Sequence, residues 1–530
     1  MADSAFGAGG DSGGSPRRFA ACGPADPLLH FTLPAEDRLP EALSALERGE
    51  AFVIPPARLS GRTTHLKSLA SALNRRGNVL ALHVPLETAA MASDQADFRR
   101  LFCARLREAL ADSAQEELRK AGFSGEEDRD PRLFLKPALS GLCASLPRPL
   151  ALLLDDLETL PGYFLLSLLH QFRDSWAGRS AYPFPRSCVL CGAGAEREIS
   201  PAPEPGLGGP RAPVDLPALP LEVPPFTEAE IRRLLALHTA EGGREYSPEA
   251  AEEAFYWSGG APAAVGALAR AVDEEILTGD HSRKAAGKDF DQAAAKVMQR
   301  REAGISGAVK ALEDPAAALA FEAMVLGAPG LPKEADGEAL RRARLAGLLR
   351  EGEGELAPAS PLVRDACLEE ITRMIAYGMH KGAERRAPEG RETDMTAALK
   401  AFQGYFQENR DAVPAPFGMR KALGHLALLA FLKKTLPSDS SLLAEFGLGR
   451  GRLDLLALIR GEASPVGAVV KESETRLKEA VSPMSRYMDR CRAKEGWLVA
   501  FDPDPSVGWE KKITWRTEKH DGRAVHIVGA

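Results

Sequence analysis

The chain has 530 residues, a formal net charge of -7, and 45% hydrophobic and 27% charged residues. This length argues against one compact domain and favours about three or four domains in a soluble protein. No apolar stretch reaches the roughly 20 residues needed to cross a bilayer, so we expect no membrane insertion. The negative net charge gives no overall attraction to nucleic acid, although a local basic patch could still exist.

The first 22 residues are rich in Gly, Ala and Ser and have no apolar core of the kind a secretory signal needs. They predict a disordered leader on a cytoplasmic protein. Seven scattered cysteines indicate free or buried thiols rather than a disulfide framework. Cys188 and Cys191 have metal-like spacing, but they lie in the strand-like SCVLCG without a second Cys or His pair, which favours a core role.

The first chemical motif is PPARLSGRTTHL, residues 55–66, which follows the apolar run FVI and precedes apolar residues at helical spacing. A strand, a loop and a helix in this order resemble a phosphate-binding loop, where backbone amides and the helix N-terminus face phosphates. Arg62 stands where such loops have lysine, and its planar fork is not the same compact charge. An ordinary turn before a helix is the alternative.

A second acidic segment strengthens the interpretation. PLALLLDDLETL runs four apolar residues into Asp155 and Asp156, as in a buried parallel strand whose end presents carboxylates to magnesium and water. The alternative is a strand followed by a solvated acidic turn. With the strand-like VLALHVPLE between the two segments, the sequence predicts a P-loop α/β domain.

The order of several segments resembles the bacterial AAA-like P-loop ATPases that carry a C-terminal PD-(D/E)XK nuclease-like domain. The resemblance covers nearly the whole chain after residue 22, including GPADPLLHFTLP, the loop, LLLDDLETLPGYF, FPRSCVLCGAGAEREI and GGAPAAVGALARAV. It implies an α/β multidomain protein with a P-loop AAA-like parallel sheet and a restriction-endonuclease-like C-terminal domain. Together with the segment patterns, it predicts a nucleotide-binding domain over 23–210, a helical lid over 211–280, a winged-helix-like joint over 281–383, a charged linker over 384–394 and the nuclease-like domain over 395–530.

The resemblance also implies ATP and Mg²⁺ as cofactors. The residues it assigns to the nucleotide are Arg58, Ser60, Gly61, Arg62, Thr63 and Thr64, with Thr63 and Asp155 holding magnesium. Asp156 stands where the family usually has the glutamate that orients the attacking water, and its side chain is one methylene shorter. Gly194 replaces an arginine of the family. These departures predict weak or absent hydrolysis.

The middle of the chain carries helix signals. Thr227 before Glu230 predicts a capping box, and Ser247 with Pro248 predicts another helix start. The segment LAGLLREGEGELAPASPLVRDACLEEI resembles the last helix, hairpin and following helix of a winged-helix domain. It has no obvious basic recognition helix, so we favour a joining role over DNA binding.

The C-terminal region begins with two segments that we expect to form amphipathic helices, TAALKAFQGYFQENRDAV and MRKALGHLALLAFLKKTL. Asp454 in GRGRLD matches the first metal-binding aspartate of PD-(D/E)XK nucleases, which pair it with E-x-K on the next strand. Here the next segment is VVKESETRLK. With Lys471 in the glutamate position the lysine position is Ser473, and with Glu472 there it is Glu474, so neither alignment keeps E-x-K. An inactive platform is favoured, although Asp454, Glu472 and Glu474 could form an altered metal site.

The sequence therefore predicts an ATP-binding protein that works by nucleotide-dependent conformational change, with degraded ATPase and nuclease motifs. An active ATPase-coupled DNA nuclease and a non-catalytic interaction scaffold are the alternatives. Nucleotide is the expected ligand; whether DNA or a protein is a partner, and the oligomeric state, stay open.

Overall fold

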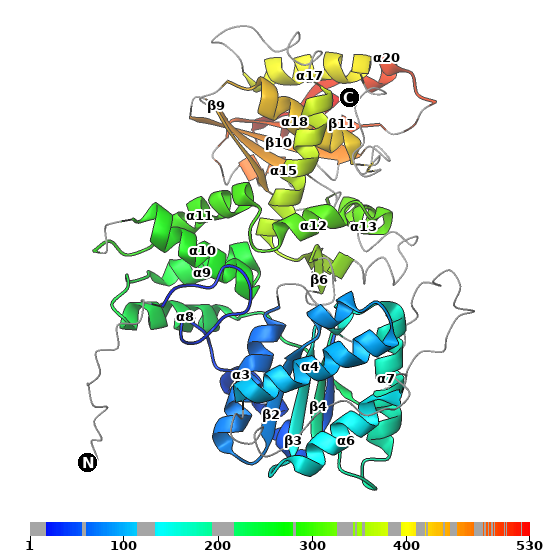
Figure 1. The fold of residues 1–530 in the computed structure, drawn as a ribbon. Helices are drawn as coiled ribbons and strands as arrows, with labels where there is room; N and C mark the ends of the chain where they lie inside the picture. The colour runs from blue at the N-terminus through cyan, green and yellow to red at the C-terminus, as the bar shows by residue number, and fades with distance from the viewer. Residues whose placement is uncertain are drawn as a thin grey trace. The chain divides into compact units, whose positions relative to one another are not determined.

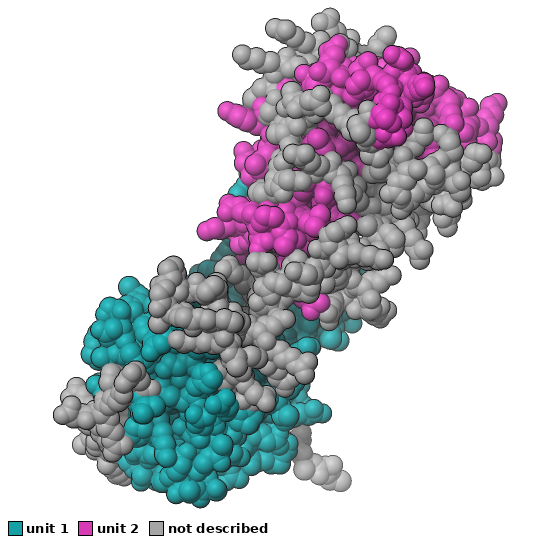
Figure 2. Space-filling view, turned by 90° about the vertical axis from the view of Figure 1, so that its right-hand side faces the viewer, with its two compact units in different colours: residues 1–303 teal, residues 304–530 magenta. Residues whose placement is uncertain are grey.

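The computed structural model divides the chain into two compact units, Met1–Ala303 and Gly304–Ala530, coloured separately in Figure 2. No helix in the described part of the chain is both long and apolar enough to cross a membrane. The described residues are 17–55, 60–113, 133–192, 217–278, 282–325, 343–344, 347–351, 356–379, 394–409, 419, 422–437, 440–445, 453–459, 461–470, 477, 481, 484–485, 487–488, 491, 493–502, 504, 506–520 and 522–530.

The first unit is built on a five-stranded parallel sheet with the order β2-β3-β4-β1-β5 (Figure 1). β1, β3 and β4 are buried along their whole length, as expected for apolar strands covered on both faces. The strands are β1 Ala51–Ile54, β2 Leu80–Pro85, β3 Leu150–Asp155, β4 Ser187–Cys191 and β5 Leu219–Pro220.

Helices cover both faces of this sheet. One core joins the strands to α1 Ala35–Arg38, α2 Pro40–Arg48 and α3 Arg62–Arg76. The other core joins them to η1 Glu87–Met91, α4 Gln95–Ser113, α6 Leu135–Ser145, η3 Leu157–Thr159 and α7 Gly162–Ala177. Cys188 belongs to the second core and Cys191 to the first, because side chains alternate along a strand. The two thiols therefore point to opposite faces of the sheet.

A group of short helices, which we refer to below as the lid, completes the first unit. The elements are α8 Glu228–Ala240, α9 Pro248–Ser258, α10 Pro262–Ala271, the π-helix η4 Val272–Ile276 and α11 Gly287–Arg300. The predicted capping box is confirmed, since Thr227 accepts from the amide of Glu230 while the Glu230 carboxylate accepts from the amide of Thr227. α11 packs against α9 and α10 and lies in the first unit, whose boundary at 303 falls beyond the position of 280 taken from the sequence.

The second unit begins with α12 Ile305–Ala311 and α13 Pro315–Val325. An antiparallel hairpin of β6 Leu349–Glu351 and β7 Leu356–Pro358 then leads to α15 Pro361–Gly378. The hairpin and the helix after it lie where the sequence predicted them. Ser360 caps α15 by accepting from the amide of Val363 at 3.2 Å.

The remainder of the second unit contains a six-stranded mixed sheet with the order β12-β13-β11-β10-β9-β8. β8, β9 and β10 pair antiparallel, whereas β11 runs parallel to β10 and β13 runs parallel to β11. The bounds are α17 Met395–Asn409, α18 Leu423–Thr435, β8 Ser441–Glu445, β9 Leu453–Ile459, β10 Glu462–Val470, β11 Glu495–Phe501, α20 Trp509–Lys512, β12 Trp515–His520 and β13 Arg523–Gly529.

The expectation of two amphipathic helices here is wrong for the second one. All nine residues of α18 from Gly424 to Leu432 are buried. The helix lies against α15 and α17, and His425 packs on the ring of Phe501 from β11. A helix that is apolar on every side is buried in a core rather than laid on a surface.

Candidate nucleotide-binding site

The site begins where the loop after β1 meets α3. Gly61 has a φ of +74°, and a Cβ on it would lie 3.4 Å from Cγ of Pro262 at the start of α10. Only glycine adopts this conformation without strain. Ser60 and Gly61 precede the first amides of α3, which have no acceptor within the helix and are available to an anion. Arg58 lies outside the described residues.

Thr64 is engaged by the segment that precedes the sheet. The amide of Ala25 donates to the Thr64 hydroxyl at 3.0 Å. This contact fixes the hydroxyl of Thr64 against the N-terminal segment, so of the two threonines Thr63 is the one whose side chain turns toward the acidic strand.

Asp155 ends β3 and is almost fully buried. Its Oδ2 atom accepts from Nε2 of His83 at 3.0 Å, and its carboxylate also accepts from the Cys191 thiol and the Thr63 hydroxyl. Burial alone would raise the pKa of Asp155, but these hydrogen bonds outweigh it and hold the pKa below its ordinary value. Asp155 is therefore an ionised carboxylate beside a hydroxyl oxygen.

Thr63 and Asp155 are the pair assigned to magnesium by the sequence, and the fold brings them together. Hydroxyl and carboxylate oxygens are ligands that Mg²⁺ accepts, and the ion is commonly held by one or two carboxylates together with substrate phosphates and water. Within the described ranges there is no cluster of three or more His, Cys, Asp and Glu side chains that could hold a metal. The donor set thus fits magnesium that arrives with a nucleotide.

Asp156 is the residue after Asp155 in the chain, and both its backbone conformation and its electrostatic environment are unusual. Its φ of 61° is left-handed, which an aspartate tolerates better than most residues. Burial, followed by the charges of Asp155 and Glu158, raises the pKa of Asp156 to about 6. Asp156 and Thr63 both line a cavity of about 430 Å³, so the predicted water-orienting group faces the same space as the predicted magnesium ligand.

Arg62, the residue in the lysine position, is held by an acidic neighbour that the sequence reasoning missed. Its guanidinium forms an ion pair with Glu158, which lies in η3 just after β3. Burial opposes the charge of Arg62, but Glu158 keeps its pKa above the usual value. Nη1 of Arg62 is buried and has no hydrogen-bond partner among the described residues. The spacing of Glu158, three residues after Asp155, was the available signal.

The sequence did not predict His83 and Cys191 as partners of Asp155. His83 is the one polar side chain in LALHVP, and β2 pairs with β3 so that Pro85 lies opposite Asp155. Cys191 ends β4, the neighbour of β3 on its other side. Carboxyl ends of parallel strands meet at one edge of a sheet, which is why three strands contribute to one carboxylate's surroundings.

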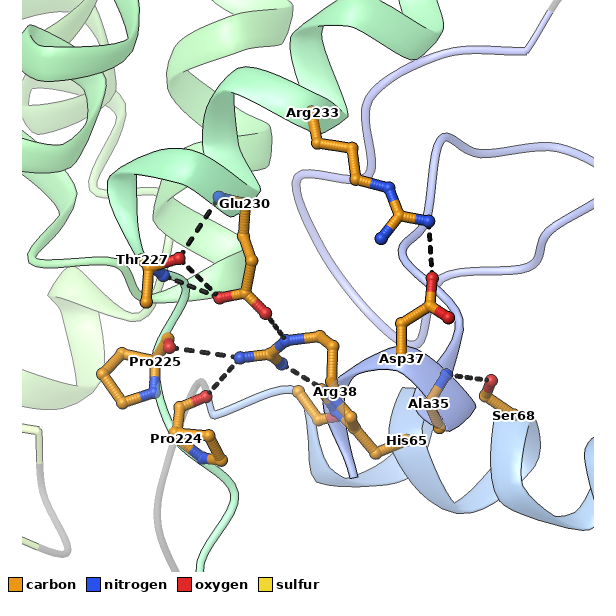
Figure 3. A network of polar contacts seen from close by, with 11 residues as sticks. Ala35, Asp37, Arg38, His65, Ser68, Pro224, Pro225, Thr227, Glu230 and Arg233 are labelled. Atoms are coloured by element: carbon orange, nitrogen blue, oxygen red, sulfur yellow. Dashed lines mark hydrogen bonds and ion pairs between the residues drawn. The ribbon is translucent and has the colours of Figure 1, made fainter. Parts of the chain in front are cut away.

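A network of polar contacts joins α3 to the lid (Figure 3). Arg38, at the end of α1, has only 2% of its side chain exposed and donates to Glu230 at 2.7 Å. It also donates to the carbonyl oxygens of Pro224 at 2.7 Å and Pro225 at 3.1 Å, and its guanidinium lies 4.5 Å from the ring centre of Phe226. One buried cation therefore holds the entry to α8.

The same cation reaches the loop through a histidine. Arg38 donates to Nε2 of His65 at 2.5 Å, and Nδ1 of His65 donates to the carbonyl of Gly61 at 2.8 Å. Burial, assisted by the charge of Arg38, lowers the pKa of His65 to about 4, so the ring is neutral at pH 7. Gly61 is thus linked to Glu230 of the lid by two buried side chains, Arg38 and His65, which Figure 3 labels.

The second predicted site, in the C-terminal sheet, is described only in its backbone. Asp454 lies in β9 and pairs with Gly467 of β10, three residues before that strand ends at Val470. The side chain of Asp454 and all of Glu472 and Glu474 lie outside the described residues.

The five-stranded parallel sheet with helices on both its faces matches a P-loop AAA-like α/β fold. No protein-family model matches the chain, and no curated protein matches it in sequence.

Several solved structures are similar to parts of this chain at low sequence identity. The Walker-type ATPase PABY2304 of Pyrococcus abyssi is 15% identical with a TM-score of 0.40, over 63% of this chain and 94% of its own. The RuvB Holliday junction branch migration motor of Thermotoga maritima is 15% identical with a TM-score of 0.32, over 61% and 90%. Cdc6p from Pyrobaculum aerophilum is 12% identical with a TM-score of 0.34, over 75% and 93%. At these sequence identities and TM-scores, we infer no activity of this chain from the three structures.

Proposed function

We propose that the chain binds ATP with Mg²⁺ at the start of α3 and converts occupancy of this site into a change in the lid, with little hydrolysis. The observation that carries the proposal is the contact between the Thr63 hydroxyl and the ionised Asp155 carboxylate at the N-terminus of a helix. The amides from Ser60 to Thr64 would hold the phosphates. Thr63 and Asp155 would hold magnesium, which supplies charge neutralisation of the phosphates when bound.

Weak turnover is part of the proposal. Asp156 is one methylene shorter than glutamate, and its pKa of about 6 keeps a fraction of the carboxyl protonated near neutral pH. The charge of Arg62 is already balanced by Glu158. Both features weaken the stabilisation of the transition state for hydrolysis. They leave the binding of ATP in the ground state intact.

Calorimetry with ATP and Mg²⁺ tests the binding claim. We expect saturable heat for the wild type and a loss of at least about tenfold in affinity for Thr63→Ala, because a charge-assisted contact is worth roughly 1.5–3 kcal/mol. Thr278→Ala, at an exposed position in the lid, is the matched control and should bind like the wild type. Absence of heat and of any thermal shift in the wild type would refute nucleotide binding.

Hydrolysis is tested separately with Asp156→Glu. The longer side chain restores the reach of the family's usual residue, so phosphate release should rise above that of the wild type. Asp156→Asn should not hydrolyse faster than the wild type. Rapid turnover by the wild type itself, at about 1 per second or more, would instead support a working ATPase.

For the C-terminal part we propose a nuclease-like platform over 395–530, joined through a winged-helix-like segment over 281–383 and a linker over 384–394. The antiparallel β8-β9-β10 arrangement followed by the parallel β11 supports this proposal. The backbone position of Asp454 in β9, opposite Gly467 near the end of β10, supports it as well. We expect no cleavage of plasmid DNA with Mg²⁺ or Mn²⁺. Cleavage that disappears in Asp454→Ala would establish the alternative, an active nuclease coupled to the nucleotide site.

A further inference from the structure

The charges around the site indicate that it needs a further cation to bind the phosphates. Three carboxylates, Asp155, Asp156 and Glu158, gather at the end of β3, and Arg62, the cation among the described residues of the loop, is paired with Glu158. A nucleoside triphosphate adds further negative charge. Because P-loops usually meet the terminal phosphates with a compact ammonium group, a second cation is needed close to the start of α3.

Lys67 lies in the right place. It lines the cavity of about 430 Å³ together with Thr63 and Asp156. Its side chain is exposed, and among the described residues it takes part in no hydrogen bond or ion pair. Arg105 is the other cation lining this cavity, but it is paired with Glu108 on its own helix, α4, and donates to Thr88. Lys67 therefore differs from Arg62 and Arg105 in having no ion-pair partner among the described residues.

The helix geometry directs Lys67 toward the phosphates. Positions 63 and 67 are four residues apart in α3 and so lie on the same face of the helix. Side chains on a helix point back toward its N-terminus, which carries the Lys67 ammonium group toward Thr63 and the exposed amides. A lysine stem spans about one helical turn, so an anion at the N-terminus is within reach.

We propose that Lys67 contacts the terminal phosphate of the bound nucleotide and supplies the compact positive charge that Arg62 cannot. This assignment rests on the proposed function, since it concerns the same site. Lys67 acts as a binding and specificity residue: it favours a triphosphate over a diphosphate, because only the triphosphate extends past the loop into the cavity that Lys67 lines.

Titration of ATP and of ADP, each with Mg²⁺, into the wild type and Lys67→Gln tests this assignment. We expect Lys67→Gln to lose about tenfold or more in ATP affinity and less than about twofold in ADP affinity, as for removal of a charged hydrogen bond to one phosphate. Lys67→Arg keeps the charge and should retain part of the preference for ATP. Lys288→Gln, at an exposed position on α11, is the control for loss of one positive charge.

The outcomes separate the two claims. Binding by the wild type with equal losses for ATP and ADP in Lys67→Gln, or with no loss, would overturn the assignment of Lys67 and leave nucleotide binding standing. A selective loss of ATP affinity in Arg105→Gln, with Lys67→Gln unaffected, would overturn it as well and name the other cation. No binding of either nucleotide by the wild type would refute the proposed function, and the role of Lys67 with it. An unchanged thermal midpoint for Lys67→Gln shows that an affinity loss is not unfolding.

Discussion

Arg38 and His65 are joined by a hydrogen bond of 2.5 Å between the Arg38 guanidinium and Nε2 of the imidazole. Arg38 comes from α1, before the sheet begins, and His65 comes from the first turn of α3. Since His65 also donates to Gly61 and Arg38 also donates to Glu230, the pair connects the loop to the lid helix α8. The contacts that connect the loop to α8 therefore do not pass through the sheet.

Replacing Arg38 with alanine should loosen the lid. The change leaves the Glu230 carboxylate and the carbonyls of Pro224 and Pro225 without their buried donor, and it removes the contact with Phe226. We expect the free energy of unfolding of the first unit to fall by about 3 kcal/mol, because removing one partner of a buried ion pair leaves the other charge without compensation. Hydrogen exchange of residues 224–231 should become faster, and thermal unfolding should occur earlier.

A second lid contact provides the control for this prediction. Arg233 of α8 pairs with Asp37 of α1, but both side chains are substantially exposed. Arg233→Ala should therefore cost less than about 1 kcal/mol. If the two variants destabilise the unit equally, the buried network around Arg38 does not hold the lid.

His65 should make the region around the loop sensitive to acid. Burial and the charge of Arg38 lower the pKa of His65 to about 4, whereas its value in the unfolded chain is 6.5. Between these two values the unfolded state binds more protons, so stability is retained above pH 6.5 and is lost as the pH falls toward 4. One proton corresponds to at most about 1.4 kcal/mol per pH unit.

The measurement is hydrogen exchange of residues 61–66 between pH 4 and 7, corrected for the intrinsic exchange rate. In His65→Gln, the free energy of local opening at residues 61–66 should depend less steeply on pH. The decrease in slope should correspond to one bound proton. His425 of α18 has a pKa similarly lowered to about 4 by burial, but it lies in the second unit. His425→Gln should leave the behaviour of residues 61–66 unchanged. Retention of the full slope in His65→Gln would contradict the assignment.

Asp156 should have the opposite pH dependence. Its pKa of about 6 exceeds the unfolded value of 3.8, so the folded state binds more protons between these values and its stability falls as the pH rises through 6. Asp156→Asn removes this effect and also tolerates the left-handed backbone. At pH 7 the variant should be more stable by about 1 kcal/mol, allowing for solvent screening of a half-exposed carboxyl.

Urea unfolding at pH 5 and pH 7 measures the effect of this change. The advantage of Asp156→Asn over the wild type should be larger at pH 7 than at pH 5. Asp174→Asn, on the exposed face of α7, is the matched control and should change stability little at either pH. If Asp156→Asn raises the free energy of unfolding equally at both pH values, the charges of the neighbouring residues do not destabilise the ionised Asp156.

The parts of the site that the sequence predicted are those close together along the chain. The strand, loop and helix around Gly61, the strand ending at Asp155 and the capping box at Thr227 each depend on a local pattern. The partners that were missed are remote: His83 is 72 residues from Asp155, and Glu230 is 192 residues from Arg38. Their contacts follow from the strand order and the docking of the lid, which no local pattern specifies.

Gly192 offers the sharpest test of how Glu158 is positioned. It follows β4 with a φ of +90°, and a Cβ built on it would clash with Oε2 of Glu158 and lie 2.9 Å from the Glu158 amide nitrogen. The glycine therefore makes room for the carboxylate that holds Arg62. Gly192→Ala should displace Glu158 and release Arg62 from its pair, in addition to straining a left-handed backbone.

Gly77 separates these two effects. It ends α3 with a similar φ of +78°, but a Cβ there would meet nothing within 4 Å. Gly77→Ala should cost only the backbone strain, about 1 kcal/mol, because an L residue must adopt a left-handed conformation. Gly192→Ala should cost at least about 2 kcal/mol more, in the range of overpacking at a closely packed position. Chemical denaturation of both variants measures the difference. Adding Glu158→Ala removes the side-chain clash and should recover part of the loss at Gly192 but none at Gly77; equal costs for the two glycine variants would show that Gly192 does not support the Arg62 pair.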